Sequence, residues 1–156
     1  KEIGNAGFGL TSNGLVAADC TEDKIRVRAN LNSLMKQTTS GTVADQDEDL
    51  IFQLAAKPGG GSSLVRSDVG KSESSVIATD IDNTDVNGDG NGDGLTFNYF
   101  DQNGNAVSPD AAVRVAVTIR IILPQVGQPG APGFQPQVTK QLSSSVVLRN
   151  SRPLAY

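Results

Sequence analysis

The 156-residue chain contains no histidine and a single cysteine, Cys20. These two absences exclude Ser-His-Asp and Cys-His triads, histidine-ligated zinc and any internal disulfide. We expect Cys20 to be an idle thiol. Tryptophan is also absent, and aromatic residues make up only 4% of the chain. A glycosidase needs two carboxylates beside a sugar-binding cleft, and such clefts usually carry aromatic platforms. The sequence therefore predicts a protein that is not an enzyme.

No apolar run reaches the length of about 18 residues that a membrane span requires. The longest apolar segment, Ala111 to Leu123, is interrupted by Arg114 and Arg120. The chain begins without methionine or a signal peptide, so we expect a processed or truncated chain whose beginning is missing.

Basic residues are absent between Lys71 and Arg114, although the whole chain has a net charge of only -4. The same stretch contains these acids: Glu73, Asp80, Asp82, Asp85, Asp89, Asp93, Asp101 and Asp110. An acidic stretch repels phosphate backbones, and no basic patch appears elsewhere, so nucleic-acid binding is not expected. Cations are the more plausible partners.

Alternating apolar and polar residues are the strongest pattern in the chain. This alternation predicts β-strands that each have one dry and one wet face. The predicted strands cover residues 25–31, 50–54, 64–66, 76–81, 95–100, 113–123 and 137–149. A turn at 57–61 predicts a hairpin. The Pro/Gly loop 124–136 contains Phe134, which either forms an exposed interaction tip or packs back on its own loop.

The predicted sheet is mostly antiparallel, and its dry face needs a covering layer. No amphipathic helix of adequate length occurs in the chain, but Lys1 to Ala6 can form the last turn of a helix that stops at Gly7 or Gly9. A helix upstream of Lys1 would supply the missing layer. We therefore expect one α+β domain over residues 1–156, in which residues 1–18 contain the end of a largely truncated N-terminal helix and a loop.

The order of these segments resembles the large minor pilins. KEIGNAGFG resembles the phrase that closes the long N-terminal helix in that family. The segments that follow have the spacing of PilW-like minor pilins and of the pseudopilins of type II secretion: IRVRANLN, DQDEDLIFQL, LTFNYFDQNGNAV, VRVAVTIRIIL and SSSVVLRN. The resemblance covers most of the chain, but residues 82–94 look like an insertion.

This resemblance implies a pilin-like α+β head with long loops, whose N-terminal helix packs on the antiparallel sheet. It implies a structural, non-enzymatic subunit of a type IV pilus or a type II secretion-like filament. The partners would be other pilin or pseudopilin subunits. The subunit would contact the inner membrane only through the missing helix. The subunit would face the periplasm from the inner membrane before assembly and lie in an extracellular filament afterwards.

The insertion is an acidic, glycine-rich loop. Its oxygen-bearing side chains recur at every second residue: Asp85, Asn87, Asp89, Asn91 and Asp93. The spacing from Asp85 fits the first half of an EF-hand loop, with Gly90 at the sharp turn. The twelfth position is Thr96 and not glutamate, so a looser calcium loop is predicted, with Asp80, Asp82 or Asp101 completing the ligands. A solvated, flexible connection is the alternative, since these residues are also common in turns.

Two further alternatives stay open at this point. The acidic cluster Asp45, Asp47, Glu48 and Asp49 is interpreted as a solvated turn before a strand rather than a ligand set. The whole chain can also be a secreted, calcium-dependent β-sandwich, either an adhesin or a carbohydrate-binding module. The residues that precede Lys1 discriminate this module from a pilin.

Overall fold

The computed structural model describes residues 2–31, 48–57 and 60–148. Its strands are β1 (Lys24–Arg28), β2 (Asp49–Ala56), β3 (Ser62–Asp68), β4 (Glu73–Ile81), β5 (Leu95–Phe100), β6 (Arg114–Leu123) and β7 (Val138–Val147). Three short 3-10 turns accompany them: η1 (Ile3–Asn5), η2 (Ala17–Asp19) and η3 (Pro109–Ala111). The strands predicted from alternation are confirmed, with bounds that shift by a few residues.

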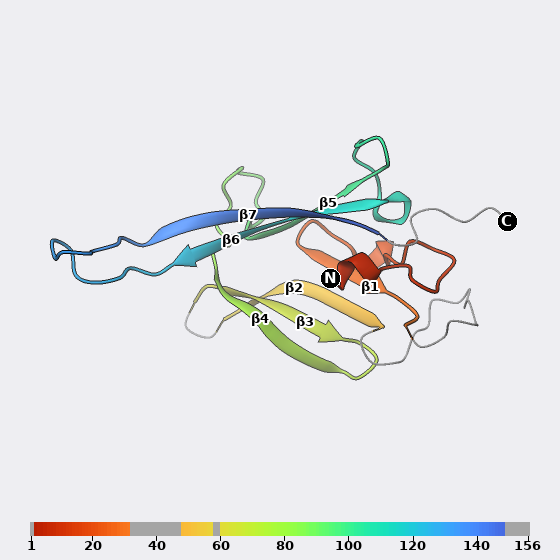
Figure 1. The fold of residues 1–156 in the computed structure, drawn as a ribbon, viewed down its shortest axis with the longest axis horizontal. Coiled ribbons are helices and arrows are strands. Elements are labelled where there is room, and N and C mark those ends of the chain that lie inside the picture. The colour runs from red at the N-terminus through yellow and green to blue at the C-terminus, as the bar shows by residue number, and fades with distance from the viewer. Residues whose placement is uncertain (1, 32–47, 58–59, 149–156) are drawn as a thin grey trace.

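All seven strands belong to one antiparallel sheet, in the order β1-β2-β3-β4-β6-β5, and β7 pairs with the other edge of β6. β4 and β6 share only one residue pair, Ile81 with Ile121. At this narrow junction the sheet divides into two half-sheets, which we call the lower half-sheet (β1–β4) and the upper half-sheet (β5–β7), as they lie in Figure 1.

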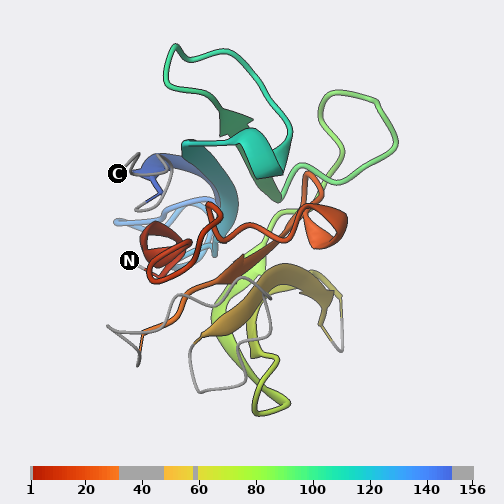
Figure 2. The ribbon, with the colours of Figure 1, turned by 90° about the vertical axis from the view of Figure 1, so that its right-hand side faces the viewer.

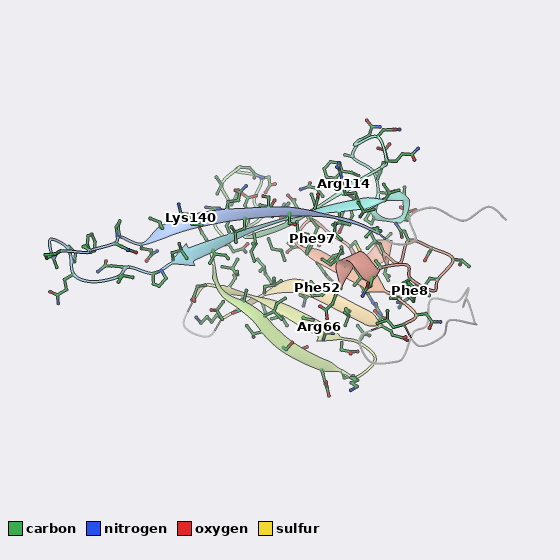
Figure 3. All side chains as sticks on the ribbon, viewed as in Figure 1. Phe8, Phe52, Arg66, Phe97, Arg114 and Lys140 are labelled. Carbon is green, nitrogen blue, oxygen red and sulfur yellow. The ribbon has the colours of Figure 1, made fainter. Side chains whose placement is uncertain are left out.

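The two half-sheets turn their dry faces toward each other and enclose the core. The lower half-sheet contributes Ile25, Val27, Leu50 and Phe52, and the upper one contributes Leu95, Phe97 and Val115. Figure 3 shows Phe52 and Phe97 on opposite sides of this core. A bent sheet thus supplies both layers that a stable domain needs.

The predicted α+β fold with a packed N-terminal helix is wrong. Strands make up 47% of the described residues and helices 7%, and no helix among them has seven residues or more. The first residues form only the single turn η1, because Gly7, Gly9 and Gly14 then take positive φ angles that interrupt any helix. The layer expected from upstream of Lys1 comes instead from the opposite half-sheet.

The N-terminal segment nevertheless lies where the two half-sheets meet (Figure 2). Ala6 is 1% exposed and belongs to the core, and Ile3 packs against the same cluster. Within the part of the chain that the structure describes, no helix combines the length and apolar character needed to cross a membrane.

Candidate functional site

An open apolar groove lies beside the N-terminal segment, between the two half-sheets. It has a volume of about 190 Å³. Its lining comes from both half-sheets and from the first residues: Glu2, Ile3, Phe52, Leu64, Ile77, Leu95, Phe97, Val117 and Val146. Ile77 remains 51% exposed there. The dry faces therefore meet around the core but stay partly uncovered along this groove.

The N-terminal segment is fixed at the groove by contacts on both sides. Glu2 Oε1 accepts a hydrogen bond from Arg66 Nε of β3 at 3.0 Å. On the other side Gly4 lies against β7, where an added Cβ would come within 3.1 Å of the Val146 side chain. Any substitution of Gly4 would press on Val146, so the absence of a side chain allows this close approach.

The acidic loop runs between β4 and β5, and its carboxylates mainly bind main-chain N–H groups. Asp85 accepts hydrogen bonds from the N–H groups of Gly88 at 2.6 Å and Gly90 at 2.9 Å. These two bonds lower the pKa of Asp85, with the Gly90 bond contributing most. Asp93 Oδ2 accepts from the N–H of Val86 at 2.6 Å. Bonds of this kind shape the loop as a series of tight turns.

The structure brings three of the five predicted ligands together. The Asn87 side-chain amide donates to Asp89 at 3.0 Å and to Asp93 at 3.3 Å. Asn91 contributes its main-chain N–H, which donates to Asp89 Oδ1 at 2.7 Å. Asp85 instead accepts hydrogen bonds from the main-chain N–H groups of Gly88 and Gly90.

The acids that were expected to complete a calcium shell are bonded elsewhere. Asp80 forms an ion pair with Lys57 at 3.1 Å. Asp82 accepts hydrogen bonds from Thr84, Arg120 and Thr139. Asp101 closes its own turn by accepting from the main-chain N–H groups of Asn103 and Asn105.

Among the residues that the structure describes, no three acidic, cysteine or histidine side chains are arranged to hold a metal ion. In this arrangement the carboxylates of Asp85 and Asp93 accept hydrogen bonds from main-chain N–H groups of the loop. Calcium binding by Asp85, Asn87, Asp89, Asn91 and Asp93 stays a prediction.

A polar hollow of about 340 Å³ lies between the acidic loop and the wet face of the upper half-sheet. Asn87 and Asp93 line it from the loop, and Thr118, Arg120 and Gln141 line it from β6 and β7. Arg120 also anchors the loop, since it donates to Asp82 at 2.9 Å and to the carbonyl of Thr84 at 3.1 Å. Alternation in β6 and β7 predicted this wet face, but the pairing with the loop depends on the fold.

Within the second acidic cluster, Glu48 and Asp49 do not lie in the solvated turn that the sequence indicated. Asp45 and Asp47 lie outside the described residues, but Glu48 is 2% and Asp49 3% exposed. Asp49 binds two arginines of β1: Arg26 through two hydrogen bonds of 2.8 Å each, and Arg28 at 2.9 Å. Alternation placed both arginines on the wet face of β1, and the fold covers that face here.

This ion cluster stabilises β1 and carries no sign of a reaction. Arg26 also bonds Asp19 at 2.6 Å. The hydrogen bond from Arg26 lowers the pKa of Asp19, and the bond to Asp49 raises the pKa of Arg26. Asp19 and Arg26 are thus each held in the ionised form by an opposite charge.

Cys20 and Tyr99 are half-buried neighbours. Burial is the main cause that raises the pKa of the Cys20 thiol, and burial also raises that of Tyr99. A thiol with a raised pKa is a poor nucleophile.

Phe134 is partly buried, and the loop that contains it is closed by the bridge between Val126 and Gln135.

Comparison with family models finds no match to this chain, and comparisons with curated proteins and with solved structures find none either.

Proposed function

We propose that the chain is the head of a non-enzymatic structural subunit, a minor pilin or pseudopilin, of a type IV pilus or type II secretion-like filament. The observation that carries this proposal is the position of the first residues. Ile3 and Ala6 lie between the half-sheets, and Glu2 and Ile3 line the apolar groove. A hydrophobic segment that enters from residue 1 would thus reach an uncovered apolar surface.

The groove has the properties of an assembly surface. Its lining is mainly apolar and comes from six strands, β2 to β7, and the N-terminal segment. Exposed apolar patches on soluble domains mark sites of contact with proteins or membranes. In the proposed function, other filament subunits contact the head, and the inner membrane holds only the upstream hydrophobic segment. The head faces the periplasm before assembly and the cell exterior afterwards.

The residues that precede Lys1 in the gene give the sharpest test. We expect a short basic leader followed by a hydrophobic stretch of about 20 residues that contains a glutamate. An ordinary signal peptide or a further β domain directly before Lys1 would contradict the proposal.

Cross-linking in cells adds a biochemical test. In a Cys20→Ser background, Ile77→Cys places a thiol at the groove, and Val86→Cys places one on the acidic loop as a matched exposed control. Ile77→Cys should form adducts with other filament subunits, and Val86→Cys should form far fewer. Equal labelling of the two positions would contradict a contact at the groove.

A second candidate is a secreted, calcium-dependent β-sandwich adhesin or carbohydrate-binding module. The two facing half-sheets and the polar hollow beside the acidic loop favour it. Discrimination again comes from the residues before Lys1, where this module requires a signal peptide or a neighbouring β domain.

A further inference from the structure

The chain covers two edges of its sheet with its own loops. At β1, the N–H of Val16 donates to the carbonyl of Arg26 at 3.1 Å, and the N–H of Arg28 donates to the carbonyl of Gly14 at 2.7 Å. These bonds satisfy main-chain groups that would otherwise be open to another strand. Covering of this kind is a common way to prevent pairing between molecules.

The edge at β5 is covered in the same way. The N–H of Phe97 donates to the carbonyl of Glu22 at 2.6 Å, and the N–H of Val107 donates to the carbonyl of Tyr99 at 3.0 Å. A bridge between Phe100 and Ala106 closes the end of the strand.

β4 is open along most of its length, but its shape resists pairing. Its register with β3 shifts twice near Leu64 and Val65, and Asp80 has a φ angle of 60°. Charges lie at both ends, at Glu73 and Asp80. Bulges and charges on an edge strand both act against the addition of a further strand.

β7 has none of these irregularities. Ten consecutive residues, Val138 to Val147, pair with β6 without a register shift. Within the described residues, no strand pairs with its other side. Figure 1 shows β7 along the border of the upper half-sheet, with its distal part reaching beyond the lower half-sheet.

The register shows which main-chain groups are open. The N–H of Arg120 donates to Gly94 and its carbonyl accepts from Asp82, so Arg120 points toward β4 and β5. Main-chain groups alternate in direction along an antiparallel strand, so Ile119 and Ile121 point toward β7. Their partners are Leu142 and Lys140. The main-chain groups that point outward therefore belong to the residues that alternate with these partners along β7, among them Thr139, Gln141, Ser143 and Ser145.

The side chains of β7 suit pairing with a like strand. Its wet face is uncharged and rich in hydroxyl groups, and Ser143 already shares a cross-strand hydrogen bond of 3.0 Å with Thr118. On the dry face, Val138 is 39% and Leu142 56% exposed. Lys140 is the single charge of the strand.

The distal part of β7 also lacks support. β5 begins at Leu95, opposite Ile119, and β4 pairs with β6 only at Ile121. Beyond Ile121 and its partner Lys140, which is labelled in Figure 3, β6 and β7 form a two-stranded ribbon. A two-stranded ribbon alone is marginally stable in water, and an added strand stabilises it.

We propose that β7 pairs antiparallel with β7 of a second copy of this chain, about a two-fold axis at Leu142. This register places Leu142 opposite Leu142, Gln141 opposite Ser143 and Lys140 opposite Ser144. It forms about eight main-chain hydrogen bonds. Centring on Ser143 would instead place the charged Lys140 opposite Val146. In both registers Lys140 lies opposite an uncharged residue, so pairing two copies brings no like charges directly together.

This pairing goes beyond the proposed function and does not depend on it. A two-fold interface closes after two copies, so it links two heads and does not extend a filament. A strictly monomeric protein would overturn the pairing, and it would leave the test at the residues before Lys1 unchanged.

The mass in solution tests the pairing, measured by sedimentation velocity over a wide range of concentrations. The protein should shift from monomer to dimer as concentration rises. Ser145→Pro removes an outward N–H without removing a bond to β6, so it should abolish the dimer and leave the circular dichroism spectrum unchanged. Ser145→Ala keeps that N–H and should retain the dimer.

Two opposite charges introduced at Leu142 test the register. They also provide an independent test if the proline variant fails to fold. Leu142→Lys and Leu142→Glu should each be monomeric, because like charges meet at the axis, and an equimolar mixture should dimerise. A protein that is monomeric at every concentration overturns the proposal. A dimer that survives the proline or either single charge, or a mixture that stays monomeric, overturns it as well.

Discussion

The two half-sheets differ in how their edge strands are covered. In the lower half-sheet, the chain's own N-terminal segment covers the edge of β1, and Asp49 neutralises the two arginines of that strand. In the upper half-sheet, no strand among the described residues pairs with the outer side of β7, and Leu142 is 56% exposed. The edge of β1 is thus completed within the molecule, whereas in the proposed pairing the edge of β7 is completed by a second copy.

The largest expected effect contrasts the core of the lower half-sheet with the edge strand β7. Ile25 is fully buried, so Ile25→Ala should lower the free energy of unfolding by about 4 kcal/mol. Leu142→Ala, measured at low concentration, should change it by less than about 0.5 kcal/mol. Urea denaturation measures both. Similar losses for the two variants would show that Leu142 is packed as tightly as a core residue.

The ion cluster gives the next effect. Asp49→Ala leaves Arg26 and Arg28 largely buried without their shared partner, so it should cost about 3 kcal/mol of unfolding free energy. Asp19→Ala removes an exposed partner of the same Arg26 and serves as the control, with a much smaller loss. Urea denaturation again applies. Equal losses would indicate that burial of Asp49 is unimportant.

The response to calcium gives the next effect, at the acidic loop beside the upper half-sheet. If the loop binds calcium, excess calcium should raise the Tm by roughly several degrees, because a ligand of the folded state stabilises it. Asp85→Ala and Asp89→Ala should remove this response, and Glu73→Ala on β4 should retain it. No response to calcium, or the same response in all variants, would end the calcium hypothesis.

The smallest effect concerns the acid stability of the same loop. The folded-state pKa of Asp85 is lowered by its bonds to Gly90 and Gly88, so its contribution is present above the ordinary value of 3.8 and is lost as pH falls through the lower folded value. The amide NMR signals of Gly88 and Gly90 should therefore titrate with a midpoint below 3.8. A midpoint at or above that value would show that Asp85 does not accept these bonds.

The sequence predicted local structure better than it predicted layers. Alternation located β6 because Val115, Val117 and Ile119 recur at every second residue, and this period is imposed by the strand itself. The same pattern shows which face is dry, but it does not show what covers that face. A helix from outside the chain was therefore predicted where the fold uses its own second half-sheet.

The candidate site divides in the same way. The acidic loop was visible in the sequence because Asp85, Asp89 and Asp93 are close along the chain. The burial of Asp49 was not, since it depends on contacts with arginines more than twenty positions away. The open edge of β7 was also hidden, because strand order has no local signal.

What the sequence determined by itself is the set of strands, their dry faces and the glycine-rich turns, since neighbouring residues impose these through backbone geometry. Only the tertiary structure decided that the sheet bends at Ile81 and Ile121, that its halves cover each other, and that the outer side of β7 has no partner strand in the described part of the chain. These features join residues far apart along the chain, and the physical reason is that burial and strand pairing depend on which surfaces meet in space.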